Sequence, residues 1–352
     1  MNILILDDKF DSIGPIDAFE SFIWTDRYCG AGDFEVYTLV DLTMLDNAKQ
    51  DYYIWTSESE HLMIIDEVII TSDVESGNHF TIRGESLEAI LGRRIIWQQT
   101  ILSGSFQDGI QQLLNDNIIN PTDPDRRMDN FIFEPSVDPA ITSLTLAAQF
   151  TGRNLYDVVK QLCDERGLGF KIVLNDNDQF VFSLYCGVDR SYAQENNPYV
   201  IFAPYFENII NSNYLETNRV LKTVALVAGE GEGIDRRTTT VGGGNGLARR
   251  ELYVDARDIQ SRTDDGTLDD PSYYALLTQR GNERLNELRF VKTFEGDVDT
   301  TSMFVYGRDF FMGDIVQLAN EWGIEASARI MEVIISHDRS GISIVPTFSI
   351  IE

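Results

Sequence analysis

A short motif occurs twice in this chain, once near each end. Glu67-Val-Ile-Ile-Thr71 recurs as Glu332-Val-Ile-Ile-Ser336, and an isoleucine stands two positions before each copy. An aspartate, a Ser-Gly pair and a further strand-forming run follow both copies, with one residue fewer in the second turn. A repeated strand-turn-strand pattern predicts the same β-hairpin in two related β-domains, one at each end of the chain.

The first 97 residues predict a domain built from β-strands. Short runs rich in β-branched and aromatic residues alternate with turn clusters such as Gly30-Ala-Gly-Asp33. The expected strands are Ile3–Leu6, Phe19–Thr25, Phe34–Leu39, Tyr52–Trp55, Leu62–Ile70 and Phe80–Arg83. Many short strands at regular spacing are typical of a barrel or sandwich. A short helix is expected from Ser86 to Arg94.

The middle of the chain mixes helical and strand patterns. Leu155, Val158, Val159 and Leu162 recur at helical spacing, and they predict a helix that Asn154 caps and Gly167 ends. A hairpin is expected at 170–185, a loop at 120–138 and a long polar helix from Asp270 to about Leu288. Everything after Phe290 predicts strand.

These patterns predict a β-rich α+β protein. We expect a first β-barrel at 1–97 and a mixed α/β middle domain formed by 98–200 plus 236–290. A second β-barrel is expected from 201–235 plus 291–352.

The charge balance limits the classes of partner. The chain has 57 acidic and 28 basic residues, which gives a formal net charge of −29. Such a field repels nucleic acid and anionic membranes, so a sequence-reading nucleic-acid binder and a stable membrane binder are both disfavoured. No run of about 18 apolar residues predicts a membrane-spanning helix. Cys29, Cys163 and Cys186 are too widely spaced to indicate a zinc site or a disulfide framework, and the chain is expected to fold in a reducing cytoplasm.

No motif in the sequence predicts catalysis, a cofactor or a metal. Gly229-Glu-Gly-Glu-Gly233 lacks the lysine of a phosphate loop, and its two acids would repel phosphate. The three histidines, His61, His79 and His337, stand beside no plausible metal partner, so surface or strand-end positions are expected. With 57 acids, carboxylate pairs are inevitable, and spacing alone singles out none of them.

Short segments along nearly the whole chain carry a resemblance through their order and spacing. They are Gly32-Asp-Phe-Glu35, Gly84–Ile96, Asn154–Val159, Gly167-Leu-Gly-Phe170, Ala228–Arg236, Arg250-Glu251, Val254–Arg257, Asp309 and Gly313-Asp-Ile-Val316. With these segments the chain resembles the siphophage tail hub family, the Gp-thirty-seven-like tail proteins, which are related to the N-terminal part of tail-associated lysins and to contractile-tail baseplate hubs.

The resemblance implies a structural, non-enzymatic homotrimer. Each chain would bring two tail-tube-like barrels, so three chains would form a ring of six under a hexameric tail tube, above a threefold tail tip. Expected partners are the tail tube or distal tail protein, the tape-measure protein and tail-tip or fibre proteins, with DNA only in passage through the channel. The expected location is the virion tail tip, after assembly in the host cytoplasm. Longer relatives continue into a peptidoglycan-cleaving or fibre domain, and this chain stops at Glu352, so we expect that activity to be absent here or to lie on another protein.

Two other functions remain open at this stage. One is a cell-wall (peptidoglycan) hydrolase that uses paired acids, and the other is a carbohydrate-binding receptor module. The second would use exposed tryptophans among Trp24, Trp55, Trp97 and Trp322. If the chain assembles, the candidates for intersubunit or interdomain contacts are the basic pairs Arg93, Arg94, Arg249 and Arg250. Ordinary solvated surface charge is an equally good interpretation of these four side chains.

Overall fold

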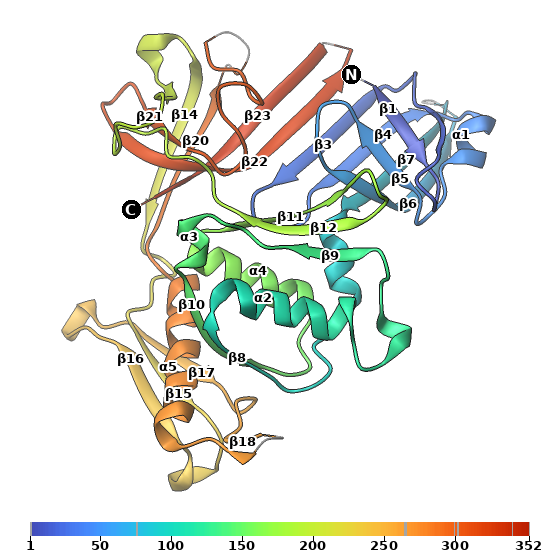
Figure 1. The fold of residues 1–352 in the computed structure, drawn as a ribbon. Helices are drawn as coiled ribbons and strands as arrows, with labels where there is room; N and C mark the ends of the chain where they lie inside the picture. The colour runs from blue at the N-terminus through green and yellow to red at the C-terminus, as the bar shows by residue number, and fades with distance from the viewer. Residues whose placement is uncertain are drawn as a thin grey trace.

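The computed structural model has one large sheet and two smaller units beneath it (Figure 1). It describes residues 2–74, 77–263, 266–298, 300, 303–339 and 341–351. The large sheet has the order β14-β20-β23-β22-β3-β4-β7-β6-β5-β1-β2, and off this path β21 pairs with β22 and β13 pairs with β21. Its pairs are antiparallel except for β13 with β21. Strands from both ends of the chain therefore form one continuous surface.

The N-terminal part of this sheet agrees closely with the expected strands. Its elements are β1 (Ile3–Leu6), β2 (Ser12–Pro15), β3 (Ser21–Arg27), β4 (Asp33–Leu39), α1 (Leu42–Asn47), β5 (Tyr53–Thr56), β6 (Leu62–Asp73) and β7 (Gly77–Ser86). The 3-10 helix η1 (Leu87–Arg93) follows, and it buries Leu87, Ile90 and Leu91 as expected.

The C-terminal part of the sheet is made from two separate stretches of sequence. Its strands are β13 (Ile201–Phe202), β14 (Ile209–Thr217), β20 (Val291–Val298), β21 (Ile315–Ala319), β22 (Glu325–Asp338) and β23 (Gly341–Ile350), with the 3-10 turn η4 (Pro204–Phe206) after β13. One buried apolar cluster runs beneath both parts and includes Trp24, Phe34, Phe202, Phe294 and Ile335.

The repeated motif forms equivalent hairpins, as predicted. Glu67 lies opposite Arg83 in the β6–β7 hairpin, and Glu332 lies opposite Thr347 in the β22–β23 hairpin. Each hairpin has a β-bulge at the same place, between Ile65 and Glu67 and between Ile330 and Glu332. Part of each turn falls at residues 75, 76 and 340, outside the described residues. The two hairpins share one register, including the irregularity.

The middle unit packs helices against two small sheets. Its elements are β8 (Thr100–Ser105), α2 (Phe106–Leu114), the π-helix η2 (Asn115–Ile119), η3 (Pro124–Arg126), β9 (Phe131–Glu134), α3 (Pro139–Thr142), β10 (Thr145–Phe150), α4 (Leu155–Arg166), β11 (Gly169–Leu174) and β12 (Phe180–Tyr185). Strand β8 pairs with β10, and β12 lies between β11 and β9. The loop expected at 120–138 is wrong in part, because β9 lies inside it and pairs in parallel with β12.

Helix α4 has the caps and the buried face that the sequence predicts. The Asn154 side chain accepts hydrogen bonds from the backbone N–H groups of Tyr156 and Asp157, and Gly167 ends the helix with a left-handed backbone, φ 64°. The side chains that the helix buries are Leu155, Val158, Val159, Leu162 and Cys163. They belong to one apolar cluster with Phe170 and Phe180, which confirms the expected packing.

A third, smaller unit lies at the bottom of Figure 1. Strand β15 (Val224–Ala228) lies between β16 (Thr238–Gly242) and β17 (Glu251–Asp255), and α5 (Asp270–Glu287) packs on this sheet around Tyr273 and Leu277. The other elements here are η5 (Gly233–Asp235), η6 (Gly246–Ala248), β18 (Arg262–Thr263) and β19 (Gly266–Thr267). Strand β15 thus differs from the expectation for 201–235, since its hydrogen-bonding partners are β16 and β17 and not strands of the large sheet.

The observed class is β-rich with a large, mainly antiparallel sheet and few helices, as expected. The closed two-barrel arrangement and the three-domain division stay predictions. Within the described residues, no helix is long and apolar enough to cross a membrane.

Candidate functional site

The two repeats meet along one seam inside the chain. The outer edge of β22, from Glu332 to Asp338, pairs antiparallel with β3, so that Glu332 lies opposite Arg27 and Ile335 lies opposite Trp24. Arg27 forms an ion pair across the seam with Glu332 at 2.7 Å and a second ion pair, with Asp33 of β4, at 2.5 Å. Val333 and Ile335 are completely buried under the joined strands. The seam therefore fastens the two ends of the chain together.

The register of the hairpins extends to the strands beside them. Glu85 of β7 lies opposite Asp33 of β4, and the equivalent Ser349 of β23 lies opposite Thr293 of β20. The next residues along β4 and β20 are then equivalent, Phe34-Glu35 to Phe294-Glu295, and both phenylalanines are buried. Since Trp24 lies opposite Phe34, and Tyr214 lies opposite Phe294, strand β14 is the counterpart of β3.

The comparison of the two repeats, over the residues that the structure describes, identifies two strand edges, one on β14 and one on β6, that lack the neighbouring strand their counterparts have. Among the described residues, β14 ends the sheet, and β6 beyond Ile65 pairs with β7 alone. In the other repeat, the counterpart of that β6 edge is the edge of β22 that β3 covers. Ile70 is 57% exposed, whereas its counterpart Ile335 is buried, and Leu215 on β14 is 49% exposed. Exposed apolar strand edges of this kind are sites for adding another strand.

Tyr28 joins the two β-domains to the middle unit. Its hydroxyl donates to the backbone oxygen of Gly167 at 2.9 Å, and Arg329 of β22 donates to the same hydroxyl at 3.2 Å. The Arg329 guanidinium also stacks on the Tyr28 ring, 5.1 Å from its centre. A side chain at Gly169 or Gly313 would collide with the ring, so both positions require glycine for this close approach.

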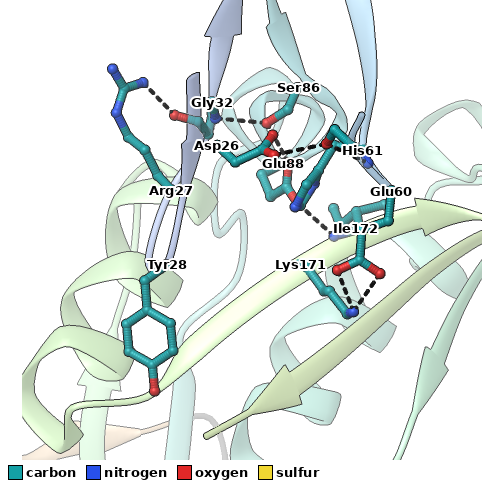
Figure 2. A network of polar contacts seen from close by, with 12 residues as sticks. Asp26, Arg27, Tyr28, Gly32, Glu60, His61, Ser86, Glu88, Lys171 and Ile172 are labelled. Atoms are coloured by element: carbon teal, nitrogen blue, oxygen red, sulfur yellow. Dashed lines mark hydrogen bonds and ion pairs between the residues drawn. The ribbon is translucent and has the colours of Figure 1, made fainter. Parts of the chain in front are cut away.

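A network of buried charged groups connects the first β-domain to β11 (Figure 2). Nδ1 of His61 lies 3.3 Å from Oε1 of Glu88, which also accepts a hydrogen bond from the backbone N–H of Ile172 at 2.7 Å. The Ser86 hydroxyl donates to the other Glu88 oxygen and accepts from the backbone N–H of Gly32 at 2.7 Å. The His61 contact has the distance of an ion pair but not the alignment of a good hydrogen bond. The interaction is therefore mainly one of charge.

The charges in this network stabilise each other. Burial alone would lower the pKa of His61, but the carboxylates of Glu88 and Asp26 outweigh it and raise that pKa to about 9. Burial would likewise raise the pKa of Glu88, but the His61 charge and the hydrogen bonds hold it below its usual range. At neutral pH the pair is therefore ionised. His61 stands directly before β6, as the expected strand-end position has it, but the expected surface environment is wrong, because both His61 and His79 are buried.

The structure also brings together two acids that sequence spacing did not single out. The Gln161 side chain of α4 donates to Glu165 at 3.0 Å and to Glu283 of α5 at 3.3 Å. Burial, followed by the charge of Glu283, raises the pKa of Glu165 to about 7. The two glutamates are 118 residues apart in the chain, so no local pattern could have paired them. Among the described residues, no group of three potential ligands could hold a metal.

The four basic candidates lie in two places. Arg93 pairs with Asp51 at 3.0 Å, and Arg94 donates to backbone oxygens of Arg93 and Arg126. Near β17, Arg249 pairs with Glu251 at 2.6 Å, and Arg250 donates to the backbone oxygen of Asn218. Their proposed role between subunits or domains stays a prediction.

Comparison with known proteins places this fold among phage tail proteins. The family model described as Siphovirus ReqiPepy6 Gp37-like protein matches residues 2–348. No curated protein matches the chain. Among solved structures, the 43 kDa tail protein of prophage MuSo2 from Shewanella oneidensis aligns over 99% of this chain and 98% of its own, at a TM-score of 0.59 and 12% identity.

Two other solved structures have the same fold. Prophage tail protein gp18 from Listeria monocytogenes aligns at a TM-score of 0.57 and 14% identity, over 99% of this chain and 94% of its own. The tail protein from Neisseria meningitidis aligns at 0.57 and 12%, over 99% and 96%. With the family match over nearly every residue, the expected resemblance is confirmed: the chain belongs to the family of Siphovirus ReqiPepy6 Gp37-like proteins.

Proposed function

We propose that this protein is a structural hub of a phage tail. It forms a trimeric ring that joins a hexameric tail tube to a threefold tail tip and lines the channel for the genome. The observation that carries the proposal is the equivalence of the two hairpins. Strand β3 covers the outer edge of β22, whereas in the described part of the chain no strand covers the matching edge of β6. Family membership and the fold shared with prophage tail proteins support a tail role.

In the proposed ring, β14 of one copy covers the β6 edge of the next copy. The seam between β22 and β3 supplies the register, because each residue on it has a counterpart in the other repeat. The predicted antiparallel pairs are Glu67 with Thr217, Val68 with Glu216, Ile69 with Leu215 and Ile70 with Tyr214. In this pairing Tyr214 would cover the exposed Ile70, just as Trp24 lies opposite the buried Ile335. The burial of apolar surface would stabilise the contact.

This contact is head-to-tail, so it forms a ring only if the rotation between copies closes. Each chain supplies two related β-domains, and a sixfold tube above the ring then requires three chains. The number three rests on the family resemblance, while the pairing of strands rests on the repeat.

The net charge of −29 fits a channel that passes DNA. Acidic walls repel phosphate and prevent the genome from adhering. The same charge opposes assembly, so the acids should gather on the outer surface and lumen. Screening by salt, over a Debye length of about 8–10 Å at 0.1–0.15 M, should therefore promote the ring.

We propose no catalytic step for this chain. The partners we propose are the tail tube or distal tail protein, the tape-measure protein and tail-tip or fibre proteins. The location we propose is the tail tip, with assembly in the host cytoplasm.

Paired cysteines test the register. Directly opposite residues of antiparallel strands lie about 4.5–5.5 Å apart at Cα, within disulfide range. In a Cys186→Ser background, the double variant I69C/L215C should form intermolecular disulfides up to three chains under mild oxidation. The control I69C/Y214C is shifted by one residue, which puts the two thiols on opposite faces of the sheet. It should remain mostly uncrosslinked.

Sedimentation across a salt series tests the ring itself, with a shift from monomer to trimer expected as salt rises. A chain that stays monomeric at high salt and high concentration, or equal crosslinking in both double variants, would refute the proposal.

A further inference from the structure

A polar cleft opens beside the exposed Trp97, away from both sheet edges. Its volume is about 610 Å³, and it lies between the chain that leaves η1, the start of β8, and η2 with the residues that follow it. Besides Trp97, the lining carries five amide side chains, two carboxylates and one guanidinium, from Gln98, Gln99, Gln112, Asn117, Asn120, Asp116, Asp123 and Arg126. Nearly every lining group can therefore form hydrogen bonds.

Trp97 is held in place although it is 63% exposed. Its backbone N–H donates to Oδ1 of the buried Asn117 at 3.4 Å, and the Arg126 guanidinium stacks 5.0 Å from the indole centre. Arg126 is itself fixed, because it donates to the same Asn117 oxygen at 3.1 Å and to the backbone oxygen of Ile95 at 2.7 Å. One face of the indole is thus stacked by Arg126, while most of the side chain stays exposed.

The η2 segment supplies the support for this arrangement. Asn117 lies in the π-helix, and its Nδ2 donates to the backbone oxygen of Leu113 at 2.9 Å. Short π-helical turns are frequent at functional sites, because they place side chains where a regular α-helix does not. A ligand would meet a preformed aromatic platform and would not have to order it.

The amide groups in the cleft have hydrogen-bonding capacity to spare. Within the part of the chain that the structure describes, the side chains of Gln98, Gln99, Gln112 and Asn120 make no hydrogen bond to the protein. Amides and carboxylates can each bind neighbouring hydroxyls of a sugar, and the C–H groups of a pyranose ring pack on an indole face. An apolar ligand would leave these polar groups unpaired, and the net charge of −29 disfavours an anionic ligand.

We propose that this cleft binds an uncharged oligosaccharide, with one pyranose ring stacked on Trp97. The proposal is independent of the ring, since none of the lining residues belongs to β6 or β14. It also selects Trp97 among the four tryptophans of the chain, because Trp24 is buried and Trp55 is half-buried. Trp322 is 81% exposed but lies in the Asn320–Ile324 turn and does not line the cleft, so it is the matched control.

Calorimetric titration of the full chain tests the site. The probes are the β-1,4-linked tetramer of N-acetylglucosamine, maltotetraose and a β-1,4-galactose tetramer, with poly(glycerol phosphate) as the anionic comparison. Saturable binding of at least one uncharged tetramer is expected. W97A should weaken it at least ~10-fold, about 1.4 kcal/mol. W97F should keep part of the affinity, and W322A should stay within about twofold of the unchanged chain, since a factor of two is only about 0.4 kcal/mol.

Q112A, at an exposed position in the cleft, provides a second variant with little effect on folding, and about threefold weaker binding, near 0.7 kcal/mol, is expected. The proposal is overturned if no uncharged tetramer binds at concentrations up to about 10 mM, well above the 1 mM that corresponds to −4.1 kcal/mol. Unchanged affinity in both W97A and Q112A, or tighter binding of poly(glycerol phosphate) than of every tetramer, also overturns it.

Discussion

The ion pair between His61 and Glu88 makes stability depend on pH in a way that one substitution should remove. The pKa of His61 is raised from 6.5 to about 9, so the folded state binds its proton more tightly than the unfolded state does. At about 1.36 kcal/mol per unit of pKa shift, this contributes on the order of 3 kcal/mol well below pH 6.5. The contribution declines as the pH rises above 6.5 and is lost as the pH rises through 9. The lowered pKa of Glu88 adds stability that is present above pH 4.5 and lost as the pH falls.

Glu88→Gln keeps the shape of the side chain and an acceptor for the backbone N–H of Ile172, but it removes the charge. We expect the free energy of unfolding to fall by about 2–3 kcal/mol at pH 7 and the difference from the unchanged chain to close by about pH 10. Urea denaturation at pH 6 to 10 measures this. Glu60→Gln is the control, because it removes the neighbouring exposed pair with Lys171 and should cost less than about 1 kcal/mol at every pH.

With three histidines in the chain, NMR can follow the His61 ring directly. A titration near pH 6.5 in the unchanged protein, or an E88Q difference that stays constant from pH 6 to 10, would refute this reasoning.

Three further substitutions test the packing between elements. Leu162→Ala should cost about 2–5 kcal/mol in urea denaturation, because it empties a buried site, and a change within about 0.5 kcal/mol would mean that the site is not buried. Glu165→Gln should stabilise the fold by about 1–2 kcal/mol at pH 8 and by little at pH 4.5, because the raised pKa of this half-buried group costs stability as pH rises through 7. An equal effect at both pH values would contradict it. Tyr28→Phe should lower the melting temperature through the loss of about 1–2 kcal/mol, since the oxygen of Gly167 loses its donor; no change would mean that this hydrogen bond adds nothing.

Features encoded by neighbouring residues were predictable from the sequence. Helix α4 follows from the spacing of its apolar residues, from Asn154 and from Gly167, all within a stretch of 14 residues. The two hairpins follow from the repeated motif, and even the common bulge lies at the same point of both copies.

Features that depend on distant partners were not predictable. Strand β9 exists because β12, about 50 residues later, pairs with it in parallel, while its own surroundings are rich in proline and acids. The residues near Glu88 in the sequence do not indicate that η1 buries this carboxylate along with its apolar side chains. The partners of Glu88, His61 and Ile172, lie 27 and 84 residues away. The Glu165–Glu283 contact and the cleft beside Trp97 have the same origin, since packing between separate elements creates both.

The repeat and the net charge together explain how exposed strand edges could serve assembly without causing aggregation. A β6 edge with Ile69 and Ile70 would be a hazard on a neutral protein, because any strand could add to it. With a net charge of −29, copies of the chain repel one another. A contact that forms few favourable interactions does not overcome this repulsion. An open dimer pairs one β6 edge and one β14 edge but leaves another of each exposed. A closed ring pairs every edge in the register that β22 and β3 already use, so in the proposed assembly closure supplies the stability that overcomes the repulsion.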